Sequence, residues 1–197
     1  GVKALGEEFS ARFCAEAFTK QGYPAIYADP KEAGMLLSDE YGNAQLLPES
    51  MNLLHEYLSA VKEIVIFPGF YGYTRSGSVV TFSRGGSDIT GAILAAAIHA
   101  DVYENFTDVD SVYPVDPRIV PDAILVEDMT YEEAMELSFF GSKVLHPKTL
   151  APLASKGIEA WSLNSHNPAS RGTRIAQGPF PSAAVVGPVR GISCLKN

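Results

Sequence analysis

The chain has 197 residues, of which 46% are hydrophobic and 19% are charged, a composition typical of a globular domain with a substantial core. Its net charge of −8 and its pI near 5.0 argue against a nucleic-acid-binding surface and against docking on an anionic membrane. No apolar run approaches the roughly 20 residues of a membrane helix, and Cys14 and Cys194 are too few for a disulfide framework or a metal site. We therefore expect a soluble, cytoplasmic protein without nucleic-acid or membrane partners, in which local arginines and lysines can still bind small anions.

The N-terminal part of the chain predicts a helix, a strand and a second helix. A helical pattern runs over residues 7–20, residues 23–29 are typical of a strand, and Pro48 opens the next helix. Between them, residues 30–47 are polar and rich in turn-forming residues, which predicts a surface excursion. The predicted apolar face of the first helix consists of Phe9, Phe13, Ala17 and Phe18, with Ala11, Cys14 and Ala15 filling small positions.

Two short apolar runs follow. Residues 64–67 are all apolar, which is typical of a strand covered on both faces in a parallel sheet, and residues 78–82 predict another buried strand. The glycine- and aromatic-rich segment 68–74 follows the first of these strands. In open α/β sheets, ligands bind outside the carboxyl ends of the strands, so this loop lies where a site is expected.

The sequence Arg84-Gly85-Gly86-Ser87-Asp88 joins the second strand to the most apolar helical segment of the chain. Adjacent glycines let the backbone turn sharply and leave its N–H groups open to a ligand. Ser87 or Asp88 is predicted to cap the helix, whose N-terminus favours an anion, and Arg84 adds a planar fork suited to a carboxylate or phosphate. An ordinary capped turn with a solvated arginine is the alternative.

A strand is predicted over residues 101–106 and a brief one over residues 124–126. Between them, residues 107–118 combine three aspartates with two prolines, which makes the segment too polar for a core and too stiff for a linker. A long loop of this kind inside a compact domain is usually functional.

Beyond this loop, Thr130 and Glu133 form a capping-box pattern that opens a helix. A further helix is predicted over residues 148–155, stopped by Gly157, and a strand over residues 159–163. The proline- and glycine-rich residues 168–188 are typical of a connector.

The sequence lacks the P-loop pattern, the G-x-G-x-x-G dinucleotide fingerprint, the G-x-S-x-G nucleophile elbow and the H-E-x-x-H zinc motif. With these motifs absent, the remaining candidates for a functional site are charged and small residues at predicted strand ends. This mixture suits a phosphorylated ligand together with a small zwitterion.

Four segments in order and spacing resemble aspartate kinases of the amino-acid kinase superfamily, and the likeness runs from about Gly6 to about Ala176. The segments are Ser83-Arg84-Gly85-Gly86-Ser87-Asp88, Thr107-Asp108-Val109-Asp110-Ser111-Val112-Tyr113, Asp116-Pro117-Arg118 and Phe140-Gly141-Ser142-Lys143-Val144-Leu145-His146-Pro147. The resemblance implies a three-layer αβα sandwich with a mainly parallel central sheet, here incomplete. It also implies ATP-dependent phosphorylation of the β-carboxylate of L-aspartate, the first step of lysine, threonine and methionine biosynthesis, with Mg²⁺ bridging the phosphates.

The resemblance further assigns roles to residues at the substrate end. Arg84 would clamp the α-carboxylate of aspartate, aided by Gly85, Gly86 and Ser87, and Glu7 would take its α-ammonium group. An arginine fork and a glutamate at opposite ends would select an α-amino acid.

The positions implied to line the ATP site are Thr107, Asp108, Tyr113, Arg118, Lys143 and Val144. Arg84 and Lys143 would be the catalytic pair. The simpler interpretations are that Tyr113 only packs against its neighbours, that Arg118 forms a surface ion pair, that Lys143 is a solvated lysine and that Glu7 is a carboxylate at a helix dipole.

Two features depart from the family pattern. The Lys-Phe-Gly-Gly segment expected at the start of the family's kinase domain is missing, and so are the regulatory ACT domains. We expect residues 1–180 to be the C-terminal, larger part of the kinase domain and residues 181–197 a connector leading into a truncated ACT domain. The isolated chain should then be inactive and self-associating, and the full-length protein a homo-oligomer. A family member acting on another carboxylate, or a non-catalytic nucleotide-binding module, remains an alternative.

Overall fold

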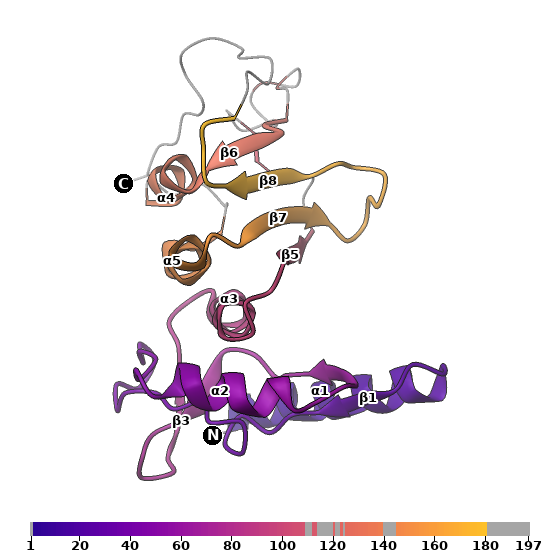
Figure 1. The fold of residues 1–197 in the computed structure, drawn as a ribbon, viewed down its shortest axis with the longest axis vertical. Helices are drawn as coiled ribbons and strands as arrows, with labels where there is room; N and C mark the ends of the chain where they lie inside the picture. The colour runs from indigo at the N-terminus through magenta and orange to yellow at the C-terminus, as the bar shows by residue number, and fades with distance from the viewer. Residues whose placement is uncertain are drawn as a thin grey trace. The chain divides into compact units, whose positions relative to one another are not determined.

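The computed structural model describes residues 2–108, 112–113, 120, 123, 125–139 and 145–180. The chain divides into two compact units, unit 1 over residues 1–98 and unit 2 over residues 99–197, and each is described by itself. Helices and strands alternate along both (Figure 1), which confirms the predicted α/β class.

Unit 1 contains a parallel strand pair, an antiparallel hairpin and three helices. Its elements are α1 (Val2–Lys20), β1 (Ala25–Tyr27), α2 (Ser50–Ser59), β2 (Ile64–Ile66), β3 (Tyr71–Tyr73), β4 (Val79–Thr81) and α3 (Gly86–Ala97). Strands β1 and β2 pair in parallel, with Ala25 opposite Ile64, whereas β3 and β4 pair antiparallel, with Tyr71 opposite Thr81. Helix α1 packs on β1 and β2, and α2 packs against α3. The expectation that residues 64–67 are covered on both faces is wrong, because Ile64 is 43% exposed.

The face of α1 that packs on the strands carries the predicted small residues Ala11 and Ala15, but not the predicted phenylalanines. Its buried residues are Ala4, Ala11 and Ala15, whereas Phe9 and Phe13 are 69% and 74% exposed. Alanines separated by seven and four positions share one helical face, and their small side chains let the helix lie close to β1 and β2. The large apolar side chains of this helix therefore do not mark its packed face.

The segment of residues 30–47 is not a surface excursion. Met35 and Leu37 are fully buried in the core of unit 1, which also includes Leu54, Val80 and Ile89. The backbone of this segment is satisfied by pairing with β3, since the Leu37 N–H donates to the Tyr73 carbonyl at 2.8 Å and the Tyr73 N–H to the Met35 carbonyl at 3.0 Å. Because this pairing with residues distant in sequence satisfies the backbone, a segment with a loop-like composition can be buried in the core.

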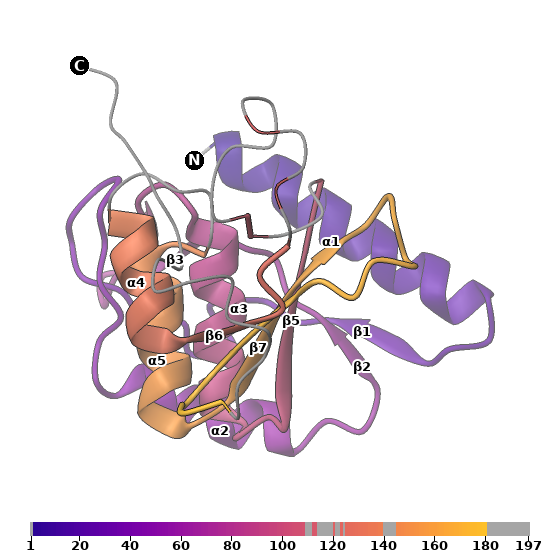
Figure 2. The same ribbon diagram turned by 90° about the horizontal axis from the view of Figure 1, so that it is seen from above.

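Unit 2 is built on a four-stranded mixed sheet with strand order β5-β7-β8-β6. Its elements are β5 (Val102–Thr107), β6 (Asp128–Thr130), α4 (Tyr131–Phe139), α5 (Pro147–Lys156), β7 (Glu159–Asn164) and β8 (Thr173–Ala176). The pairs β5–β7 and β6–β8 are parallel and β7–β8 is antiparallel, in keeping with the predicted predominance of parallel pairing. Figure 2 shows α4 and α5 side by side, and these helices pack against each other.

The helix ends of unit 2 follow the predicted local signals. The Thr130 hydroxyl accepts from the Glu133 N–H at 3.2 Å, and the Glu133 carboxylate accepts from the Thr130 N–H at 2.8 Å, which is a reciprocal capping box. Gly157 ends α5 in the left-handed conformation, with φ 66°. Two strand predictions failed, because residues 125 and 126 are not in a strand and the predicted connector contains β8.

Candidate functional site

The candidate site is centred on the turn between β4 and α3. Gly85 is the N-cap of α3 and has φ 79°, a left-handed conformation that glycine adopts without steric cost. Because the helix already begins at Gly86, neither Ser87 nor Asp88 occupies the cap position, and no side chain caps the helix. The predicted side-chain cap is therefore wrong, and the glycine backbone alone makes the turn.

The turn presents one exposed cation beside a helix N-terminus. Arg84 is exposed, and within the described parts of the chain its guanidinium forms no ion pair. The N-terminal amides of α3 and the helix dipole favour a negative charge at this end. Arg84 and the α3 amides can therefore bind a carboxylate or phosphate together.

The loop of residues 68–70, which follows β2, interlocks with this turn. A Cβ atom placed on Gly69 would lie 2.7 Å from the Ser87 Oγ, and one placed on Gly86 would lie 2.7 Å from the Phe70 Cβ. Both distances are well inside normal packing contact, which is about 3.5–4.0 Å between carbon atoms. The two glycines are thus required for the close approach of loop and turn. Sequence analysis identified this loop as lying at a strand end but did not include its residues in the site.

Glu7 reaches the same loop from α1. Its Oε1 accepts a hydrogen bond from the Gly69 N–H at 3.2 Å. Since α1 begins at Val2 and has no acidic residue in its first turn, Glu7 is not explained as a carboxylate at the helix dipole. The structure therefore brings Glu7, Gly69, Gly86 and Ser87 together, as the predicted substrate end requires.

Tyr71 lies directly behind the loop. Its ring stacks edge-on against the ring of Phe70, with 5.7 Å between the centroids, and its side chain is 1% exposed. Burial raises the pKa of Tyr71 well above its ordinary value, so the phenol stays neutral. Tyr71 therefore supports Phe70 by packing and adds no charge to the site.

Two of the residues predicted to line the ATP site, Thr107 and Asp108, lie at the end of β5 in unit 2. The Thr107 hydroxyl donates to the Asp108 carboxylate at 3.3 Å, and the Thr107 carbonyl accepts from the N–H and the hydroxyl of Ser165 at 2.9 and 3.0 Å. Asp108 is exposed and Tyr113 is half-buried. Arg118, Lys143 and Val144 lie outside the described residues.

Thr173 orders the segment before Tyr113. Its fully buried hydroxyl donates to the Val126 carbonyl and accepts from the Val112 N–H at 3.3 Å. Because Val112 immediately precedes Tyr113, these bonds anchor the predicted nucleotide-binding tyrosine to β8. The sequence pattern predicted neither this strand nor the role of Thr173.

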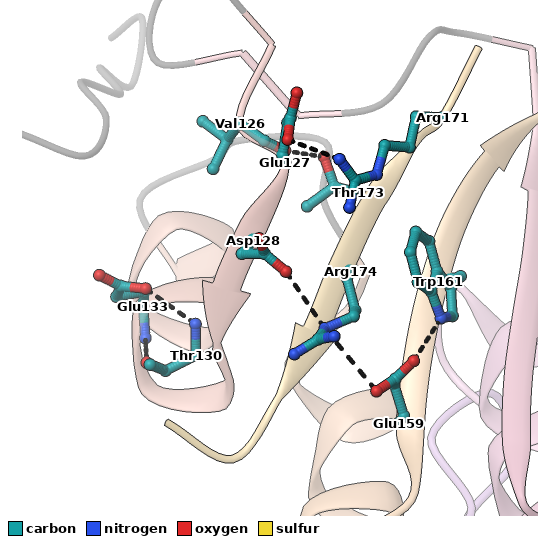
Figure 3. A network of polar contacts seen from close by, with 10 residues as sticks. All are labelled: Val126, Glu127, Asp128, Thr130, Glu133, Glu159, Trp161, Arg171, Thr173 and Arg174. Atoms are coloured by element: carbon teal, nitrogen blue, oxygen red, sulfur yellow. Dashed lines mark hydrogen bonds and ion pairs between the residues drawn. The ribbon is translucent and has the colours of Figure 1, made fainter. Parts of the chain in front are cut away.

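Figure 3 shows the polar network that spans β6, β8 and β7. Arg174 Nε lies 3.1 Å from Asp128 Oδ1 and 3.7 Å from Glu159 Oε2, and the Trp161 indole N–H donates to Glu159 at 2.7 Å. The two Arg174 contacts join neighbouring strands, and the Trp161 bond orients Glu159 from within β7, so the network stabilises the sheet. It includes none of the predicted site residues.

Within the described residues, no helix is long and apolar enough to cross a membrane. A surface cavity of about 440 Å³ lies at Leu37, Leu47 and Arg75 of unit 1, and no predicted site residue lines it.

Comparison with known proteins places the chain in a family. The model of the amino acid kinase family matches residues 2–164. The chain is 47% identical to aspartokinase 3 of Bacillus subtilis over 88% of its own length and 38% of that protein. It is 36% identical to a bifunctional aspartokinase/homoserine dehydrogenase of Haemophilus influenzae over 100% of its own length and 24% of that protein.

A solved structure agrees with these matches. Aspartokinase III of E. coli in complex with aspartate and ADP superposes with a TM-score of 0.80 at 32% identity, covering 89% of this chain and 40% of that one. The chain thus spans less than half the length of each of these relatives. The family model covers most of the chain and the fold agrees with it, so the chain belongs to the amino acid kinase family.

Proposed function

We propose that this chain is part of an aspartate kinase, which transfers the γ-phosphoryl group of ATP to the β-carboxylate of L-aspartate and forms 4-phospho-L-aspartate. The observation that carries the proposal is the joining of Glu7 and the Gly85–Ser87 turn through one loop. An acid and an anion-binding turn held at a set separation suit the ammonium and carboxylate groups of an α-amino acid. The relative from E. coli was solved with aspartate and ADP, which supports the same pair of ligands here.

In the proposed reaction, Arg84 and the amides of Gly85, Gly86 and Ser87 bind the α-carboxylate, and Glu7 binds the α-ammonium group. The β-carboxylate is then free to attack the γ-phosphorus, whose bond to the bridging oxygen of ADP breaks. Phosphoryl transfer needs mainly positioning and neutralisation of charge, and both are tasks of this donor set.

The nucleotide site is proposed at the end of β5. Thr107, Asp108 and Tyr113 would contact ATP, with Arg118, Lys143 and Val144 completing the site from segments outside the described residues. Mg²⁺ usually binds through substrate phosphates and one or two carboxylates, and Asp108, which is exposed, fits that donor set. Bound there, the metal would offset the charge of the phosphates.

The proposal extends to the domain and its setting. Residues 1–180 would form the larger part of the kinase domain, and residues 181–197 would lead into a regulatory domain. The full-length enzyme would be a cytoplasmic homo-oligomer acting at the start of lysine, threonine and methionine biosynthesis, as the resemblance to aspartate kinases implies.

Calorimetry on two arginine variants tests the substrate assignment. Arg84→Ala should weaken L-aspartate binding by about a hundredfold or more, because two charge-assisted hydrogen bonds are lost, and should leave binding of a non-hydrolysable ATP analogue unchanged. Arg75→Ala is the matched control, since Arg75 is a surface arginine paired with Glu49 at 2.5 Å, and it should change neither affinity.

Two results would contradict the assignment. Equal binding of L-glutamate and L-aspartate would favour a family member with another carboxylate substrate. Nucleotide binding without any binding of aspartate would favour a non-catalytic nucleotide-binding module.

A further inference from the structure

The groups proposed to bind the two ends of the amino acid come from different elements of unit 1. Glu7 belongs to α1, whereas Gly86 and Ser87 begin α3. Both sets contact residues 68–70, Glu7 through the Gly69 N–H and the turn through its close packing on Gly69 and Phe70. The position of this loop therefore determines how far apart the two ends of the substrate are held.

Thr90 connects the loop to α3 through two hydrogen bonds. Its hydroxyl accepts from the Phe70 N–H at 3.0 Å and donates to the Gly86 carbonyl at 3.0 Å. A threonine in a helix often donates to the carbonyl four residues earlier, so the bond to Gly86 by itself is ordinary. The bond from Phe70 comes from a separate segment, and the side chain of Thr90 is only 2% exposed. Because the Thr90 hydroxyl is the partner of the Phe70 N–H, its loss leaves this donor without its hydrogen bond inside the protein.

Phe70 needs such support because its backbone is strained. It has φ 61°, in the left-handed region that a bulky residue rarely adopts. Its carbonyl accepts from the Phe82 N–H at 2.9 Å, so the residue is held from both sides, by Phe82 and by Thr90. Strained residues persist where the surroundings determine their conformation, and they cluster at functional sites.

We infer that Thr90 is a positioning residue for the amino-acid substrate. It holds Phe70 in the strained turn that directs the Gly69 N–H toward Glu7, and it ties this turn to Gly86 on the carboxylate-binding side. The hydroxyl thus sets the separation between the ammonium-binding acid and the carboxylate-binding turn, and so the discrimination for an α-amino acid. The inference rests on the proposed function of these two groups, and Thr90 acts through Phe70 and Gly69.

Two variants separate the hydroxyl from the shape of the side chain. Thr90→Val keeps the shape and removes the hydroxyl, whereas Thr90→Ser keeps the hydroxyl. In Thr90→Val, we expect the Phe70 amide to exchange with deuterium about ten times faster and the Kd for L-aspartate to rise about tenfold, as for the loss of one buried hydrogen bond. The Kd for a non-hydrolysable ATP analogue should stay unchanged in Thr90→Val. Thr90→Ser should keep the wild-type exchange rate of the Phe70 amide and the wild-type Kd for L-aspartate.

A third ligand tests the claim about separation. Succinate has both carboxylates of aspartate but no α-ammonium group, so wild type should prefer L-aspartate strongly and Thr90→Val should lose most of that preference. An unchanged Phe70 exchange rate, an unchanged L-aspartate affinity, or a parallel loss of affinity for aspartate and nucleotide would each overturn the inference. A wild-type chain that binds no L-aspartate would instead overturn the proposed function, and with it the substrate role of Thr90.

Discussion

Adding a single methyl group at Gly86 tests the interlocked loop and turn most directly. In Gly86→Ala, the new Cβ would lie 2.7 Å from the Phe70 Cβ, 3.0 Å from the Phe70 Cα and 3.3 Å from the Phe82 Cβ. Phe70 cannot move aside freely, because its N–H and carbonyl are both hydrogen-bonded. Overpacking of this kind costs about 1–3 kcal/mol, and the higher helix propensity of alanine offsets about 0.5–1 kcal/mol of it. We expect a net destabilisation of up to about 2.5 kcal/mol.

Gly6→Ala is the matched control. Gly6 also lies in a helix, but a Cβ there would have no atom within 4 Å, so the substitution should stabilise the chain by about 0.5–1 kcal/mol. Urea unfolding should be followed by far-UV circular dichroism, because the single tryptophan, Trp161, lies in unit 2 and reports poorly on unit 1. If Gly86→Ala were as stable as Gly6→Ala, the close approach of loop and turn would be refuted.

Two further predictions concern stability. Phe13→Ser should change the free energy of unfolding by less than about 0.5 kcal/mol, because Phe13 is 74% exposed. Ala15→Leu should lower it by about 1–3 kcal/mol, because Ala15 is 6% exposed. If urea unfolding showed a larger loss of stability for Phe13→Ser than for Ala15→Leu, the assignment of the packed face of α1 would be reversed. Burial raises the pKa of Tyr131 to about 12, so this phenol stays neutral in the folded chain while it ionises near pH 10 in the unfolded chain. Stability should therefore fall by up to about 2–3 kcal/mol as the pH rises from about 10 to about 12. Tyr131→Phe should abolish this part of the decline, and identical alkaline unfolding curves for the two proteins would contradict it.

Local signals predicted the features whose cause lies within a few residues. Thr130 and Glu133 form their capping box because each side chain reaches a backbone N–H three positions away. Gly157 ends α5 because glycine adopts the left-handed conformation without cost. Gly85 makes the predicted turn before α3 for the same reason, although the predicted side-chain cap of this helix is absent.

Features that depend on contacts distant in sequence were not predictable in this way. Strand β8 has turn-rich flanks, and it becomes a strand because β7 and β6 pair with it on both sides. The phenylalanines of α1 formed the more hydrophobic face, but close packing on β1 and β2 favoured its alanines. Met35 and Leu37 are buried because β3 satisfies the backbone around them.

For this protein, the sequence by itself determined the α/β class, the glycine turn beside Arg84, and the resemblance that the family match confirms. Only the tertiary structure decided that Glu7 and Gly86 meet through residues 68–70 and that Thr90 ties this loop to α3. The physical reason is that a turn or a cap is determined by neighbouring residues, whereas a hydrogen bond between segments 20 positions apart exists only once the chain has packed.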